Sequence, residues 1–337
     1  MILILSEQVE PSTAKVMDWL DYFGQKFHRL NAEDYLFNKI DLEFGLSSEE
    51  LTFQFTSSDL EPIIISGVDA IWYRRISFSY FPETGLPFSP NELFKNEILR
   101  NLHREYLSGK DGIFACIEDG KKILGNFRNS TVNKIEILAL VKKHGLDIPA
   151  SLLTNTKAKL TEFKYKHGSI ITKAAGEILT FKKVENSKTS SYITYTEEIT
   201  AEVLEQIPEH FYYSLFQEKL DKELEIRTFF LNDKCYSTAI FSQLNMQPQV
   251  DSRKNTNDRK VPFKLPDSIE NAIREIMAEL ELNTGSVDIV KTKGGRFVFL
   301  EVNPVGQYDM TSYSCNYHLD MEIAEYLSLN RKNEKYN

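Results

Sequence analysis

Asp288, Glu301 and Asn303 are three oxygen-bearing side chains near the C-terminal end of the chain, and their spacing could bring them together. They lie in two short, largely apolar runs that predict neighbouring β-strands. Because strand side chains alternate between faces, Glu301 and Asn303 point the same way. Two carboxylates and an amide, with no His or Cys, form a hard ligand set that suits Mg²⁺ bridging phosphate oxygens. The alternative is a solvent-exposed hairpin face that binds nothing.

A Gly-Gly pair joins the two runs and favours a two-residue hairpin turn, because glycine adopts the positive φ angles that such a turn needs. We therefore expect Lys293 to pair with Arg296, which sets Asp288 directly opposite Glu301. Pro304 then ends the second strand. On this register, the other face of the second strand carries Val298, Leu300 and Val302.

Two lysines earlier in the chain stand at the ends of predicted elements. Lys134 lies in the first turn of a helix that Asn129 or Ser130 can cap and that Gly145 ends. A cation there opposes the helix dipole, unless it serves a bound anion. Lys173 ends a short predicted strand. Taken singly, each lysine is an ordinary solvated surface residue; taken together, they indicate an anion site.

Two further basic stretches have a second interpretation each. Arg74 and Arg75 directly follow the strand that ends in Trp72-Tyr73, where they could grip an anion or a peptide. A solvated or salt-bridged arginine pair at a strand end is the alternative. Residues 178–195 predict a hairpin that contains Lys182 and Lys183, and its edge could accept a peptide by strand addition or simply pack.

A polar stretch and two arginines precede the C-terminal hairpin. The polar stretch is Gln217, Glu218, Lys219 and Leu220. It leads into a strand that carries Glu225 and Arg227, and a turn and a second strand follow. Residues 247–260 form a polar loop with Arg253, long enough to suggest a function. Residues 266–270 then open an amphipathic helix with capping chemistry.

Composition limits the classes of protein that fit. The chain has 337 residues and a formal net charge of −9, which argues against a general nucleic-acid binder. Its three cysteines are far apart and give neither a disulfide framework nor a zinc spacing, which fits a reducing cytoplasm. Cys315 and His318 form one C-x-x-H pair, for which packing is the expected role. No stretch is long enough for a signal peptide or a membrane span.

Taken in order, these residues resemble the ATP-grasp ligases over roughly residues 121–327. The shared series is a Lys at a helix start, a strand-ending Lys, a Gln-Glu hinge, an acid-x-Arg strand and an Asp…Glu-x-Asn trio. Three further stretches resemble the graspetide ligases, which form ω-ester and ω-amide bonds in peptides, and most of all the grasp-with-spasm maturases. They are Trp72-Tyr73-Arg74-Arg75, Ile240-Phe-Ser-Gln243 and Leu300-Glu-Val-Asn-Pro-Val-Gly306-Gln307. Ser242 stands where amino-acid-adding ATP-grasp ligases often carry Arg, which disfavours a glutamate ligase.

The resemblance implies a role for each residue. Lys134 and Lys173 would hold the α- and β-phosphates of ATP, and residues 217–220 would line the adenine slot. Glu225 would contact ribose or magnesium. Arg227 and Arg253 would clamp the γ-phosphate, and the acid trio would hold one or two Mg²⁺ ions. No residue is an obvious general base.

The implied substrate is a ribosomal precursor peptide with a leader and a Thr- and Glu-rich core. Its acidic side chains would be phosphorylated and joined to Ser or Thr hydroxyls, or to Lys amines. The hairpin with Lys182 and Lys183 would dock the leader, or else form a lid over ATP; Arg74 and Arg75 would contact the core. An amino-acid ligase and a non-catalytic peptide-binding protein are the alternative functions.

The expected fold is α/β, an ATP-grasp fold preceded by a pre-ATP-grasp domain. We expect an N-terminal α/β domain over residues 1–120, a central lobe over 121–212, a C-terminal lobe over 213–329 and a frayed tail over 330–337. Composition leads us to expect a cytoplasmic protein without nucleic-acid or membrane partners. The resemblance further implies a homodimer as a candidate state and a SPASM-type protein encoded nearby.

Overall fold

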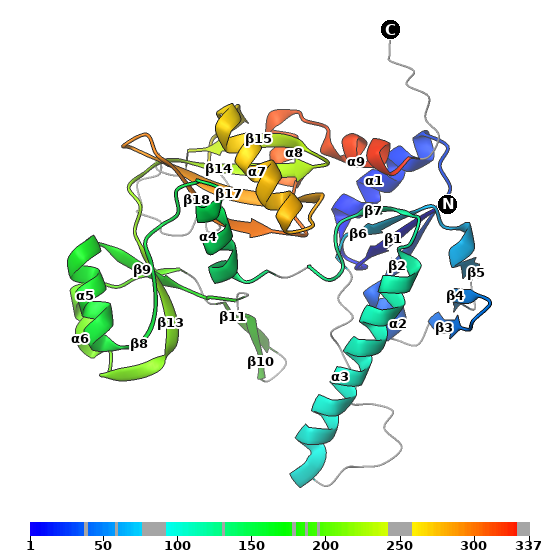
Figure 1. Ribbon diagram of the computed structural model, residues 1–337, viewed down its shortest axis with the longest axis horizontal. Coiled ribbons are helices and arrows are strands. Elements are labelled where there is room, and N and C mark those ends of the chain that lie inside the picture. The colour runs from blue at the N-terminus through cyan, green and yellow to red at the C-terminus, as the bar shows by residue number, and fades with distance from the viewer. Residues whose placement is uncertain are drawn as a thin grey trace. The chain divides into compact units, whose positions relative to one another are not determined.

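The computed structural model of the protein describes residues 1–36, 40–57, 60–75, 92–129, 132–176, 180–185, 188–193, 196–241 and 258–328 (Figure 1). The chain forms two compact units. The first comprises Met1–Ser130 with His318–Asn337, and the second comprises Thr131–Tyr317. The three-part division expected from the sequence stays a prediction. Across the described ranges, every helix is too short or too polar to span a bilayer.

The first unit is built on a four-stranded parallel sheet in the order β2-β1-β6-β7. Its strands are β1 (Ile2–Ser6), β2 (Phe27–Asn31), β6 (Ala70–Tyr73) and β7 (Lys122–Leu124). Its helices are α1 (Pro11–Tyr22), α2 (Ala32–Leu36), α3 (Glu92–Ile117) and α9 (Leu319–Leu327). Helix α9 packs against α1. The buried strand pattern expected at the N-terminus is confirmed, since β1 is buried along its whole length.

A small antiparallel sheet, in the order β3-β4-β5, completes the first unit. Its elements are β3 (Ile40–Leu46), β4 (Leu51–Ser57), β5 (Leu60–Ile64) and the 3₁₀ turn η1 (Ile65–Gly67). Phe53 and Phe55 of β4 share a buried cluster with Leu3 and Leu5 of β1 and with Phe114 of α3. This cluster holds the small sheet and the end of α3 against the parallel sheet.

The described part of the second unit contains two large sheets and a two-stranded hairpin. The central sheet has the order β12-β9-β13-β8. Its strands are β8 (Ser151–Thr156), β9 (Ile170–Lys173), β12 (Glu197–Glu198) and β13 (His210–Glu218). Helices α5 (Lys157–His167) and α6 (Ala201–Gln206) pack near Phe216 of β13: Leu160 of α5 is buried, and Phe163 of α5 and Leu204 of α6 are partly buried against the same cluster. The predicted hairpin is confirmed as β10 (Thr180–Glu185) and β11 (Lys188–Ile193), which pair antiparallel.

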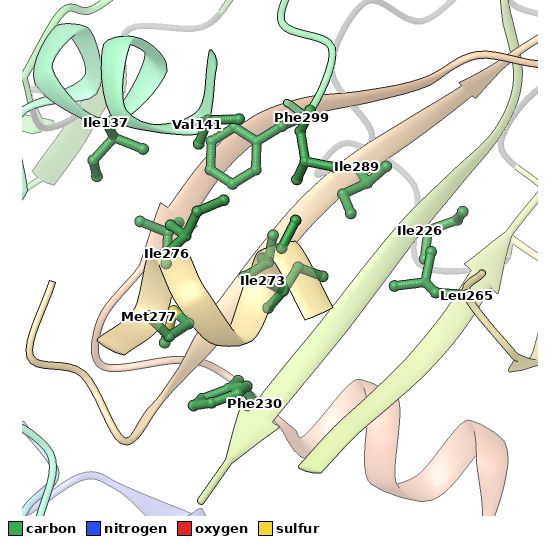
Figure 2. Packing of buried hydrophobic residues seen from close by; sticks show 14 of the residues in the cluster. Ile137, Val141, Ile226, Phe230, Leu265, Ile273, Ile276, Met277, Ile289 and Phe299 are labelled. Carbon is green, nitrogen blue, oxygen red and sulfur yellow. The ribbon is translucent and has the colours of Figure 1, made fainter. Parts of the chain in front are cut away.

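The other sheet is antiparallel with the order β16-β15-β14-β17-β18. Its strands are β14 (Lys222–Leu231), β15 (Lys234–Ile240), β16 (Lys260–Phe263), β17 (Thr284–Thr292) and β18 (Phe297–Asn303). Helices α4 (Lys134–Lys143) and α7 (Asp267–Glu279) cover one face, while α8 (Asp309–Cys315) contacts β14, β15 and β16. Figure 2 shows Ile273, Ile276 and Met277 of α7 packed over this face beside Ile137 and Val141 of α4. The predicted α/β class is confirmed.

The N-terminal caps of two predicted helices differ from the structure. Helix α4 is capped by Asn133, whose Oδ1 accepts hydrogen bonds from the backbone N–H groups of Ile135 and Glu136, and not by Asn129 or Ser130. Asn133 is the better cap because it directly precedes the helix and satisfies two orphan donors. Helix α7 begins after Pro266 without a side-chain cap.

The acid expected in the α7 capping box serves another purpose. Glu270 is buried, and its carboxylate pairs with Arg274 at 3.1 Å and with Lys264 at 2.7 Å. Buried charge is costly unless it is paired, so these two cations outcompete the backbone of the first turn for the carboxylate. The capping prediction for this helix is therefore wrong.

Helices α4 and α7 are also joined at the surface by His144. Its Nδ1 lies 3.0 Å from Glu275 and its Nε2 lies 2.9 Å from Glu279. Lys143 pairs with Glu279 as well, at 2.8 Å. The hydrogen bond to Glu279, followed by that to Glu275, raises the pKa of His144, because both carboxylates favour the imidazolium form.

Candidate functional site

One row of the five-stranded sheet brings together three of the predicted site residues. Arg227 of β14 pairs with Asp288 of β17, and Asp288 pairs with Glu301 of β18. Their neighbours Ile226 and Ile289 belong to the core under α4 and α7, so Arg227 and Asp288 point to the opposite face. Arg227 Nε lies 3.7 Å from Asp288 Oδ1. The row therefore presents one cation and two carboxylates on the face away from α4 and α7.

These side chains remain within reach of solvent. The side chains of Arg227, Asp288 and Glu301 are 22%, 29% and 36% exposed. Among the described residues, Arg227 Nε is buried without a hydrogen-bond partner, since 3.7 Å is too long for one. Such a donor is suited to a ligand oxygen, because a buried N–H group is costly to leave unpaired.

The predicted opposition of Asp288 and Glu301 is confirmed, although the hairpin reaches it by another route. The turn has three residues: Thr292, rather than Lys293, bonds with Arg296, and of the two glycines only Gly295 has a positive φ, 82°. A bulge between Asp288 and Ile289 then shifts the pairing by one residue. The two departures cancel, which restores the expected pair.

The same bulge changes which side chains of β18 reach the core. Phe299 and Val302 both belong to the cluster under α4 and α7, although they are three residues apart. The predicted face of Val298, Leu300 and Val302 is therefore wrong. A bulge inserts one unpaired residue and reverses the alternation beyond it. Leu300, within the irregular step, is half-buried.

Asn303 shapes the loop that follows β18. It pairs with Ser286, one step along from the acid row, and its side chain is exposed. Its Oδ1 accepts hydrogen bonds from the backbone N–H groups of Val305, at 3.2 Å, and Gly306, at 3.1 Å. In this conformation both lone pairs of that oxygen have donors.

Lys134 lies between the two large sheets of the second unit. It is the first residue of α4, and its side chain is 18% exposed. Its Nζ donates to the backbone oxygen of Ala174 at 3.0 Å and lies 3.8 Å from Glu301 Oε2. These oxygens supply the compensation that a lysine at a helix N-terminus needs. Lys173 ends β9 as predicted, pairs with Leu215, and directly precedes Ala174. Both predicted lysines therefore lie near one junction.

The predicted hinge is the connection between the two sheets. Glu218 ends β13, and three residues separate it from Lys222, where β14 begins. Glu218 is held to Ala150 twice: its N–H donates to the Ala150 oxygen at 2.9 Å, and its Oε1 accepts from the Ala150 N–H at 3.2 Å. Gln217 is 1% exposed, and its Nε2 donates to Ser151 Oγ at 2.8 Å.

The rest of the hinge is held by its own contacts. The N–H of Lys219 donates to the Ser169 oxygen at 2.9 Å, while its ammonium pairs with Glu198. Leu220 is half-buried. Glu225 points to the same face as the acid row and pairs through Oε1 with Lys222 Nζ at 2.9 Å.

Sequence reasoning missed Lys222. The step between Lys222 and Leu224 is irregular in β14, so simple alternation does not place the two side chains of the Lys222–Glu225 pair together. A lysine three residues before a predicted site acid was the only available signal.

The remaining predicted residues lie elsewhere. Arg74 and Arg75 belong to the first unit, where Arg74 is 2% exposed and donates to Ser12 Oγ at 3.0 and 3.2 Å. Glu10 pairs with Arg75 at 2.7 Å and with Arg74 at 3.4 Å. Binding of a substrate by either arginine stays a prediction. Lys182 and Lys183 lie on β10, but their side chains are outside the described part of the structure, as is Arg253.

The donor set fits a magnesium ion that is also held by phosphate. Over the described ranges, no three His, Cys, Asp or Glu side chains gather closely enough to hold a metal ion by themselves. Mg²⁺ in phosphate-transfer sites needs only one or two carboxylates, with the remaining positions taken by phosphate oxygens and water. Asp288 and Glu301 meet that need, and each already lies within 4 Å of a protein cation.

No protein-family model matches this chain, and no curated protein sequence matches it. Solved structures do. The macrocyclase MdnC of Microcystis aeruginosa MRC, bound with precursor peptide MdnA, is 22% identical with a TM-score of 0.75, over 97% of this chain and 99% of that one. An ATP-grasp ligase associated with ribosomal peptide modification in Chryseobacterium gregarium, in complex with ADP and a leader and core peptide, is 22% identical with a TM-score of 0.77, over 97% and 94%.

A third solved structure is more distant in sequence. The ATP-grasp ligase PsnB, complexed with Mg, ADP and a phosphomimetic variant of its minimal precursor, is 15% identical with a TM-score of 0.67 over 97% of both chains. Together these likenesses show that the chain has the ATP-grasp fold over nearly its whole length, which confirms the predicted fold.

Proposed function

We propose that the protein is an ATP-dependent peptide macrocyclase that closes rings in a ribosomal precursor peptide. The observation that carries the proposal is the row of Arg227, Asp288 and Glu301 with Lys134 beside it, set in an ATP-grasp fold. The similar structures support the substrate class, since they are ligases seen with precursor peptides, ADP or magnesium.

The chemistry requires an activated carboxylate, because hydroxide is a poor leaving group. The γ-phosphoryl group of ATP passes to a Glu or Asp side chain of the peptide, which gives an acyl phosphate and ADP. A Ser or Thr hydroxyl, or a Lys amine, then attacks the acyl carbon. Phosphate leaves, the attacking group loses its proton, and an ester or amide closes the ring. Phosphoryl transfer of this kind depends on positioning and charge neutralisation.

The predicted site residues divide these tasks. Lys134 and Lys173 hold the α- and β-phosphates as point charges, and the hinge from Gln217 to Leu220 lines the adenine slot with Glu225 near the ribose. Arg227 and Arg253 neutralise charge on the transferring group. Asp288, Glu301 and Asn303 would hold Mg²⁺, which supplies charge neutralisation at the phosphates.

For Asn303, metal binding requires its Oδ1 to be released from at least one backbone N–H group of the following loop. Asp288 and Glu301 each face a protein cation whose place the metal would take. The case for metal binding is therefore strongest for Asp288 and Glu301 and weakest for Asn303.

The precursor peptide would use other parts of the chain. Its leader docks on the β10–β11 hairpin through Lys182 and Lys183. Its acidic core reaches the Arg74–Arg75 pair, of which Arg75 has the more exposed side chain. The domain division expected from the sequence, a cytoplasmic location, a homodimer and a SPASM-type protein encoded nearby complete the proposal. The cytoplasmic location rests on the three scattered cysteines, and the others rest on the resemblance to known ligases.

Mass spectrometry tests the proposal directly. The protein is incubated with ATP, Mg²⁺ and the precursor peptide encoded beside its gene, and ADP is followed in parallel. The peptide should lose the mass of one water molecule for each ring formed. An unchanged peptide mass contradicts the proposal, and a gain of one amino-acid residue would indicate an amino-acid ligase instead.

A variant tests the metal assignment within the same assay. Glu301→Ala should abolish ADP formation and leave the fold intact, because this side chain is 36% exposed. Glu275→Ala is the matched control: it removes an exposed acid from α7, on the covered side of the same sheet, and should retain ADP formation. Turnover by Glu301→Ala would show that the acid row has been misassigned.

A further inference from the structure

Lys134 has a single ammonium group and two partners, one next to the end of a strand of the central sheet and one on a strand of the five-stranded sheet. It donates to the Ala174 oxygen at 3.0 Å, beside the end of β9, and it lies 3.8 Å from Glu301 Oε2 on β18. The proposed function gives Lys134 a third partner, the polyphosphate of ATP. One ammonium cannot hold Glu301 and the polyphosphate equally well, because their positions and charges differ.

Both carboxylates of the acid row already face a protein cation. Asp288 lies 3.7 Å from Arg227, which is fixed in register on the neighbouring strand of the same sheet. Glu301 lies near Lys134, which reaches it from another element through a long, flexible side chain. A metal ion bound at Glu301 would lie close to the positive charge of Lys134. Of the two cations, Lys134 is the one that can leave without disturbing a strand.

We propose that Lys134 controls when the acid row accepts a divalent cation. Without nucleotide, its ammonium occupies the cation position at Glu301 and opposes metal binding. When ATP enters, the ammonium moves to the polyphosphate, and Glu301 is released for the metal. This inference rests on the proposed function and assigns the order in which the site binds its ligands. The metal binds together with the nucleotide rather than before it.

The proposal predicts a gain in metal affinity, which a simple phosphate-binding role for Lys134 does not predict. Removing the ammonium should weaken ATP binding but strengthen metal binding to the nucleotide-free protein. A repulsive charge at this distance acts strongly in a partly buried site, because the local dielectric is well below that of water. We expect Lys134→Gln to bind a divalent cation about tenfold more tightly, which corresponds to about 1.4 kcal/mol.

The nucleotide-free full chain is titrated with Mn²⁺ alone at fixed ionic strength. Electron paramagnetic resonance measures the concentration of free Mn²⁺. Lys134→Gln keeps a side chain that can donate to Ala174. Lys143→Gln is the matched control, because Lys143 is on the last turn of α4, is 67% exposed and pairs with Glu279. It removes the same charge from the same helix and should leave the Mn²⁺ affinity unchanged.

A double variant decides whether the gain passes through the acid row. Lys134→Gln combined with Glu301→Gln should lose the added affinity for Mn²⁺. An unchanged or weaker affinity in Lys134→Gln overturns the proposal, and so does a gain that survives in the double variant. Lys134→Met provides a second neutral variant if circular dichroism shows that the first one is misfolded. The ring-closing assay is independent of Mn²⁺ titration, so either proposal can fail while the other stands.

Discussion

Gly306 is the position at which one added methyl group should disturb the acid site most. Its φ is +60°, and a Cβ atom there would lie 2.8 Å from the carbonyl carbon of Gly285 and 3.0 Å from the nitrogen of Ser286. Both neighbours are backbone atoms of β17, which cannot rotate away. The close approach lets the loop after β18 cross the start of β17, and the N–H of Gly306 also donates to Asn303 Oδ1.

The expected loss of stability has two parts. Left-handed backbone costs an alanine about 1 kcal/mol. Relief of the overlap with β17 adds about 2 kcal/mol, since it forces a backbone shift in a packed region. Gly306→Ala should therefore lower the free energy of unfolding by about 3 kcal/mol, measured by urea titration with circular dichroism. Because the shift moves the donor to Asn303, ADP formation should fall as well, under conditions in which the variant is still folded.

Gly295→Ala is the matched control for the conformational part. Gly295 has a φ of +82° in the hairpin of the same sheet, and nothing lies within 4 Å of its added Cβ. This variant should lose about 1 kcal/mol and keep its activity. Equal losses in the two variants would refute the reasoning, because the contact between the loop and β17 would then contribute nothing.

Three further predictions concern the core, the first unit and pH. Ile276→Ala, at a side chain 2% exposed beneath α7, should cost about 3 kcal/mol in urea titration through the cavity that it leaves (Figure 2). Glu10→Ala should cost about 3 kcal/mol, read by the fluorescence of the two tryptophans in the first unit, because it leaves Arg74 buried without its carboxylate. Because the pKa of His144 is raised in the folded protein, its ion pairs add stability at pH values below its ordinary pKa of 6.5. This added stability is lost as the pH rises through the pKa of the folded state. The urea midpoint of the wild type should therefore fall towards that of His144→Gln at high pH.

Strand alternation was the feature of the sequence that predicted the acid site. The positions of Asp288 and Glu301 on one face follow from a period of two residues and a short turn. The three-residue turn and the bulge were not predictable, because a Gly-Gly pair permits more than one turn and a bulge leaves no signature in a single sequence. The register was right only because the two departures are equal and opposite.

Contacts between distant segments could not be predicted from the sequence, for another reason. Lys134 could be placed at a helix start, but not beside Ala174 and Glu301, because nothing local relates α4 to the ends of β9 and β18. Periodicity specifies which face of an element is buried, and not which element covers it. Helix α9 illustrates this point further, since it joins α1 in the first unit after the chain has completed the second.

Arg74 and Arg75 show how the structure narrows a choice that the residues left open. Burial raises the pKa of Glu10, but the Ser12 hydroxyl and then the two guanidinium groups outweigh it, so the net pKa is lowered and the carboxylate stays ionised. Arg74, at 2% exposure, is therefore already neutralised and enclosed. The side chain of Arg75 is 30% exposed and shares the same carboxylate. An acidic side chain of a peptide would have to compete with Glu10 for either arginine. Of the two, only Arg75 is open to solvent. We therefore assign the proposed contact with the peptide core to Arg75, which Arg74 and Glu10 hold in place.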